Sequence, residues 1–111
     1  MKIRFALFVV LALMIPLVVA AQNAGKESHT LYGGKSGQVQ FPHHMHQAAV
    51  ADCMTCHDAF PQKAGSLDSL KKKGTLKKKQ VMNKTCLKCH RGLKKAGQPA
   101  GPTRCNGCHK K

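Results

Sequence analysis

Apolar residues are concentrated at the beginning of the chain. The longest apolar run, residues 5–19, follows a basic segment, residues 1–4, and is followed by small residues up to Ala21. This order predicts a secretory signal peptide over residues 1–20, cleaved after Ala20 or Ala21. The run of about 15 residues is shorter than the about 20 that span a bilayer, so an uncleaved membrane anchor is the lesser alternative.

Weaker patterns follow in the remainder of the chain. Apolar and polar residues alternate in residues 30–32 and 39–41, on either side of a glycine-rich turn, which predicts a β-hairpin. Residues 43–51, just after Pro42, suit a short helix. Residues 86–95 suit a second helix, and residues 97–102 form a turn-rich connector.

The segment 63–80 is rich in lysine, and residues 71–79 alone contain six. Blocks of like charge repel each other and resist ordering, so this segment is predicted to be a solvated loop. It lies within a single domain that covers residues 21–111. A docking patch for an acidic partner is the functional alternative.

The composition is strongly basic and poor in core-forming residues. The formal charge is +15, and removing Lys2 and Arg4 with the signal peptide lowers it to +13. Such a field attracts acidic partners. Nucleic acid is not expected among them, because no basic motif is interleaved with aromatic residues and because the chain is exported. The chain has no Trp and one Tyr, so a domain of this size needs covalent staples.

Cys-x-x-Cys-His occurs three times, and the three copies use all six cysteines: Cys53, Cys56 and His57; Cys86, Cys89 and His90; Cys105, Cys108 and His109. This is the attachment signature of c-type haem. Two thiols three residues apart lie on one side of a helical turn, where both can bond to one porphyrin, and the next residue supplies an axial imidazole. The pattern predicts three covalently attached haems c, with His57, His90 and His109 as axial ligands.

Other uses of six cysteines explain the pattern less well. Three disulfides or paired zinc sites would not require a histidine after every pair, and zinc would leave the third pair without a partner. A thioredoxin-like motif needs a βαβ pattern, which is absent from the sequence.

The ligand on the opposite face decides what each haem does. A second protein ligand makes the haem an electron carrier, whereas an open face admits substrate. The candidates are His29, His43, His44 and His46. His43 and His46 share a helical face and can project together, while His44 points about 100° away. The cluster at residues 43–46 could otherwise bind a divalent metal.

At this point the chain resembles the periplasmic triheme cytochromes c7, small relatives of the tetrahaem cytochromes c3. The resemblance rests on Phe41-Pro42-His43-x-x-His46-Gln47 and on Asp52 beside the first motif, and it runs from about Leu31 to Lys111. It implies that His43 pairs with His57 and that His46 pairs with His90.

One position departs from the family pattern. The family usually has a histidine four residues before the second motif, serving the last haem, and here Met82 occupies that position. A thioether is a legitimate ligand, and His/Met ligation raises the reduction potential above that of a bis-His haem. We expect Met82 and His109 to ligate the third haem. The alternatives are His29 or His44 in this place, an open site, or Met82 as simple packing.

The expected protein is a monomeric periplasmic electron carrier and not an enzyme. We expect a small, mostly irregular and α-helical multihaem cytochrome c fold, with an N-terminal two-stranded β-hairpin, short helices and the three haems as its core. The resemblance implies inner-membrane donors and outward acceptors in metal or ferric-iron respiration. Partners would be redox proteins with acidic surfaces, and soluble metal ions or chelates are further candidates. A reductase or peroxidase with an open third haem is the runner-up, and a haem-storage or structural protein is a third possibility.

Overall fold

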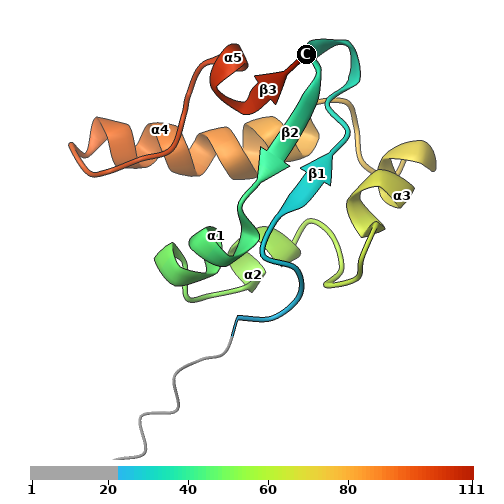
Figure 1. The fold of residues 1–111 in the computed structure, drawn as a ribbon, viewed down its shortest axis with the longest axis horizontal. Coiled ribbons are helices and arrows are strands. Elements are labelled where there is room, and N and C mark those ends of the chain that lie inside the picture. The colour runs from blue at the N-terminus through green and yellow to red at the C-terminus, as the bar shows by residue number, and fades with distance from the viewer. Residues whose placement is uncertain (1–22) are drawn as a thin grey trace, which may run out of the picture.

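The computed structural model describes residues 23–111. The predicted signal peptide and both cleavage positions lie outside these residues. Within the described part, no helix is both long and apolar enough to cross a membrane. The chain forms short helices around a small antiparallel sheet (Figure 1).

The predicted hairpin is present. Strand β1 (His29–Leu31) pairs with β2 (Gln38–Phe41), and His29 lies opposite Phe41. A 3-10 turn (Gly34–Ser36) joins them. Side chains along β2 alternate between exposed and half-buried, as the sequence pattern predicted.

A third strand was not predicted. Strand β3 (His109–Lys110) follows the last haem motif and pairs antiparallel with β2, placing His109 opposite Val39. The order in the sheet is therefore β1-β2-β3. Gly37 allows this pairing: its φ is 100°, and a side chain there would collide with the carbonyl oxygen of Lys110.

Helix α1 (His43–Ala49) begins directly after Pro42, as expected, and ends two residues earlier than the predicted segment. Helix α2 (Met54–His57) carries the first motif, and the Asp52 carboxylate accepts a hydrogen bond of 2.9 Å from the Met54 backbone N–H. Both helices lie at the end of the sheet away from the hairpin turn (Figure 1).

The lysine-rich segment is not wholly a loop. Its first half forms helix α3 (Ser66–Lys72), which half-buries Leu67 and Leu70. The remainder turns back on α3, where the Leu76 backbone N–H donates to the Leu70 carbonyl over 3.2 Å. The leucines, three residues apart, provide an apolar side for α3 in spite of the lysines that follow them.

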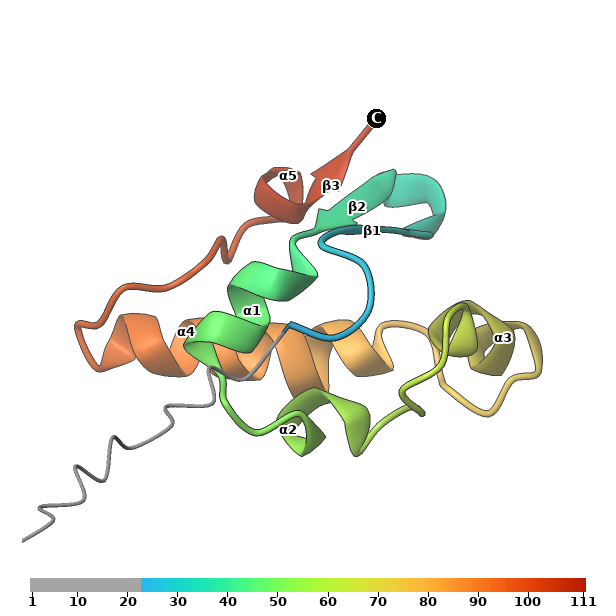
Figure 2. The ribbon, with the colours of Figure 1, turned by 60° about the horizontal axis from the view of Figure 1, so that its bottom comes forward.

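A π-helical turn (Met82–Cys86) leads directly into α4 (Leu87–Lys95), so the second motif lies on continuous helix. In Figures 1 and 2, α4 runs across the molecule and the connector after it returns toward the sheet. Helix α5 (Cys105–Cys108) carries the third motif and ends at β3.

The polypeptide has almost no core of its own. Among residues 23–111, Leu76 is the one buried hydrophobic side chain, at 7% exposure, and no polar side chain is buried. A domain normally gains its stability from apolar burial, so this chain needs large apolar groups other than its own side chains.

Candidate functional site

The two cysteines of each Cys-x-x-Cys-His motif lie on one helical turn. The first motif occupies α2 with Cys53 as its N-cap, and the second spans the end of the π-helical turn and α4. The third has its cysteines on α5 and its histidine, His109, at the start of β3. The two cysteines of each motif therefore face the same side of their helix. All six cysteines lie in the described part, and none of them is in a disulfide.

Thiols of different motifs are close enough to influence one another. Desolvation raises the pKa of Cys86, although its side chain reaches solvent, and the neighbouring thiols Cys56 and Cys108 raise it further. Desolvation likewise raises the pKa of Cys56, and Cys89 adds to the effect. One cysteine of the first motif and one of the third, Cys56 and Cys108, thus lie near Cys86 at the beginning of α4.

Five histidines share one hydrogen-bonding pattern. In each, ring Nδ1 lies 2.7–3.2 Å from a backbone carbonyl oxygen: His43 with Lys26, His46 with Pro42, His57 with Phe60, His90 with Pro102, and His109 with Gly37. A carbonyl can only accept, so Nδ1 carries the proton and donates it. The lone pair is then on Nε2, which is left to coordinate a metal, and the bond to Nδ1 fixes the ring orientation.

Four of these rings form two facing pairs. The centroids of His43 and His57 are 6.3 Å apart at 82°, and those of His46 and His90 are 6.1 Å apart at 17°. A metal–imidazole bond is about 2 Å and the ring centroid lies about 1 Å behind the nitrogen, so two imidazoles across one metal ion have centroids about 6 Å apart. Helix α1 thus brings a histidine to each of the first two motifs, and both pairs have the spacing of bis-His iron.

The residues just before α1 hold the ring of His46 in place. The Phe41 ring packs against His46 with centroids 4.3 Å apart, and His46 also bonds to Pro42 one turn earlier. Phe41 and Pro42 both belong to the Phe-Pro-His segment noted in the sequence. That segment therefore orients an imidazole as well as starting a helix.

The third motif is held by the sheet. His109 begins β3, and its Nδ1 donates to the Gly37 carbonyl over 2.9 Å, across the hairpin. Met82 opens the π-helical turn, where its carbonyl accepts from the Leu87 N–H, and its side chain is half-buried. Coordination of the third iron by Met82 stays a prediction.

His29 and His44 lie near His43. The His29 ring meets the His43 ring edge-on at 5.3 Å, and desolvation followed by the charge of His43 lowers the pKa of His29. His44 contacts the Gly25 carbonyl through Nε2 at 3.0 Å, the nitrogen that the other five leave free. Both positions are at the α1 end of the sheet, whereas His109 pairs with Val39 nearer the hairpin turn.

These residues fit haem c better than a bare metal ion. In the described part, no three His, Cys, Asp or Glu side chains converge as metal ligands would. The chain instead offers thiols in pairs, imidazoles with free Nε2 atoms, and a fold lacking an apolar core. A covalently attached porphyrin would use all three features.

Comparison with known proteins agrees with this geometry. The sequence model of the family described as cytochrome c7 and related cytochrome c matches residues 39–110. The chain belongs to the cytochrome c7 family. Membership gives this cytochrome covalently attached haem c, one group for each of its three motifs, and a role in multihaem electron transfer.

Individual relatives support the assignment. This cytochrome is 38% identical over 80 residues to a cytochrome c7 of Geobacter metallireducens, covering 72% of each chain. It is 32% identical to a cytochrome c3 of Desulfuromonas acetoxidans, covering 70% of its own length and 90% of the relative. The solution structure of the triheme cytochrome PpcA from Geobacter sulfurreducens matches with a TM-score of 0.55 at 36% identity. That match covers 78% of this chain and all of the other.

The carbonyl partners of the motif histidines were not found from the sequence. Phe60, Pro102 and Gly37 accept from His57, His90 and His109 through backbone atoms, which leave no side-chain signature. The Gly-Pro pair at 101–102 was the one available signal, and it indicated only a turn.

Proposed function

We propose that this cytochrome is a periplasmic electron carrier whose three irons are each ligated by protein on both faces. The observation that supports this best is the set of five histidines with Nδ1 bonded to a carbonyl and Nε2 free. Two pairs of them face each other at 6.1 and 6.3 Å. An iron with six protein and porphyrin ligands has no position for substrate and exchanges only electrons.

In this proposal each motif attaches one haem through its two cysteines. The first haem is ligated by His57 and His43, and the second by His90 and His46. Because α1 supplies one ligand to each from a shared face, the two haems lie close together along a single helix. Closely spaced haems of matched ligation suit rapid electron exchange between them.

The third haem is ligated by His109 and Met82. Neither alternative histidine is well placed for it, because His29 packs on His43 and His44 uses its Nε2 to contact Gly25. The soft thioether favours ferrous iron, so this haem has the highest potential of the three. It accepts the first electron and holds it more firmly than the other two.

The lysine-rich segment is a docking surface next to that haem. Lys71 Nζ donates to the Tyr32 carbonyl over 3.0 Å and lies 5.4 Å from the centre of the Tyr32 ring. A cleft of about 600 Å³ lies between α3 and the hairpin, lined by Tyr32, Asp68, Lys71, Lys72, Leu76 and Lys78. The hairpin turn that Lys71 contacts also carries Gly37, the hydrogen-bond partner of His109.

The partners of this cytochrome are redox proteins with acidic docking surfaces, including other multihaem cytochromes. A charge of +13 on the exported chain attracts such surfaces over a distance of about one Debye length. Donors at the inner membrane and acceptors leading outward, in respiration on metals such as ferric iron, follow from the family relationship. The signal peptide expected at residues 1–20 accounts for the periplasmic location.

Exposure to small haem ligands tests the proposal. Carbon monoxide added to the ferrous protein, and cyanide added to the ferric protein, should leave the absorption bands of all three haems unchanged over minutes. Prompt binding by one haem would instead favour a reductase or peroxidase with an open iron. Binding confined to the third haem would show that Met82 does not ligate it.

A further inference from the structure

We propose that Gly101 and Pro102, here called the clasp, hold the imidazole of His90 and so set the reduction potential of the second haem. The inference rests on His90 being an axial ligand, as proposed above. The clasp lies in the connector between α4 and α5, about ten residues beyond His90 in the sequence. It belongs to neither the second motif nor its ligands.

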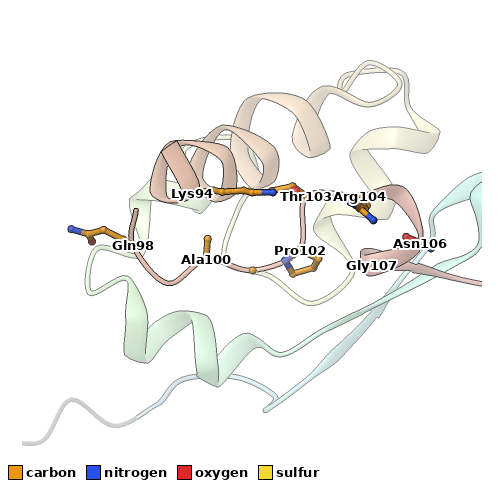
Figure 3. A pocket seen from close by; sticks show the side chains of 9 residues that line it. Lys94, Gln98, Ala100, Pro102, Thr103, Arg104, Asn106 and Gly107 are labelled. Atoms are coloured by element: carbon orange, nitrogen blue, oxygen red, sulfur yellow. The ribbon is translucent and has the colours of Figure 1, made fainter. Parts of the chain in front are cut away.

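The hydrogen bond of the clasp is the shortest of its kind here. His90 Nδ1 lies 2.7 Å from the Pro102 carbonyl oxygen, compared with 2.8–3.2 Å for the other four axial histidines. Figure 3 shows Pro102 on the connector as it doubles back alongside α4. The connector also lines a shallow cleft of about 480 Å³ with Lys94 and Arg104.

Gly101 is what lets the carbonyl come so close. A Cβ at this position would be 2.5 Å from Cε1 of His90 and 2.9 Å from its Nδ1. Carbon atoms in van der Waals contact are about 3.5–4 Å apart, so ring and backbone cannot both keep their places. The φ of Gly101 is outside the left-handed region, so space alone requires glycine here.

The clasp is also supported from the third motif. A Cβ on Gly107 would be 2.6 Å from the Cβ of Pro102, so Gly107 leaves room for the proline ring. Because Gly107 lies between Cys105 and Cys108 on α5, the turn that carries the third motif braces the ligand of the second haem. The two sites are thus mechanically joined through Pro102.

A strong hydrogen bond from Nδ1 makes the imidazole a better donor to iron through Nε2. A more basic ligand stabilises ferric over ferrous iron and lowers the potential. Lengthening the bond should therefore raise the potential of the second haem. Loss of such a hydrogen-bond partner changes metal affinity or activity by about tenfold. A tenfold change in the ferrous-to-ferric ratio corresponds to a shift in potential of about 59 mV for a one-electron couple.

The test is Gly101→Ala in the mature holoprotein, with Gly92→Ala as the matched control. Gly92 is two residues after His90, and a Cβ there meets nothing within 4 Å. Redox titration followed by NMR should show the ferrous fraction of the second haem rising several-fold at a fixed potential in Gly101→Ala, and unchanged in Gly92→Ala. An unshifted second haem in Gly101→Ala, or equal shifts in both variants, overturns the clasp.

A second measurement uses the unaltered protein, in case Gly101→Ala does not mature. In the ferrous state the Nδ1 proton of His90 should exchange with solvent more slowly than that of His43, whose bond is equally exposed and is 3.2 Å long. Equal or faster exchange at His90 overturns the inference. If the wild-type spectra show no bis-His second haem, the proposed ligation has failed. Intact ligation with an unmoved potential means that only the clasp has failed.

Discussion

The lysines of the docking surface can be removed while the contact that anchors it is kept. Lys71 is half-buried and bonded to Tyr32, so it is left in place. The other five lysines of residues 71–79 are exposed: Lys72, Lys73, Lys77, Lys78 and Lys79. Changing these five to Gln lowers the polypeptide charge of the exported chain from +13 to +8. Their removal should slow electron transfer with an acidic partner without disturbing the fold.

The size of the effect follows from the charges. At 0.01 M salt the screening length is about 30 Å, and a lysine about 8 Å from one partner carboxylate changes association about twofold. Five such lysines give about 30-fold. At 0.15 M salt the screening length is about 8 Å, the factor per lysine falls to about 1.4, and the product is about fivefold.

Stopped-flow reduction by an acidic [2Fe–2S] ferredoxin measures this directly. The matched control changes five exposed lysines outside the segment to Gln, giving the same net charge: Lys26, Lys84, Lys88, Lys94 and Lys95. The docking variant should be slowed about 30-fold at 0.01 M salt and the control much less. Equal slowing of the two variants would show that only net charge matters and would refute a docking surface at α3.

Three further predictions concern ligation and folding. Met82→His should lower the potential of the third haem toward the other two, and an unchanged third haem would mean that Met82 is not a ligand. His46→Ala should let one ferrous haem bind carbon monoxide, whereas His44→Ala should leave all three closed, because His44 uses its Nε2 to contact Gly25. The haem-free chain should show no cooperative thermal transition by circular dichroism, because among residues 23–111 only the Leu76 side chain is a buried hydrophobic one. Cooperative melting at the midpoint of the holoprotein would contradict this.

The haem motifs and the hairpin could be predicted because their signals are local. Cys-x-x-Cys-His has a fixed spacing on one helical turn, and residues 30–32 and 39–41 alternate across a glycine-rich turn. Pro42 likewise indicated where α1 begins. In each case the residues that determine the element are neighbours in the sequence.

The remaining features depend on contacts between distant residues. Strand β3 has two residues, too few for any periodic pattern, and forms because the third motif brings His109 beside β2. The run of lysines kept helix α3 from being recognised in the sequence. The hydrogen bond that attaches α3 to the hairpin joins Lys71 to Tyr32, which is 39 positions away. The carbonyl partner of His109 is 72 positions away. No local pattern reports pairings of this kind.

The central claim is that all three irons are closed by protein ligands, two by histidine pairs and one by His109 with Met82. NMR of the fully reduced protein tests it most directly, because a methionine methyl bound to ferrous haem is shifted far upfield by the porphyrin ring current. We predict one such methyl, assigned to Met82, with three diamagnetic low-spin haems. A paramagnetic high-spin haem in that spectrum would contradict it.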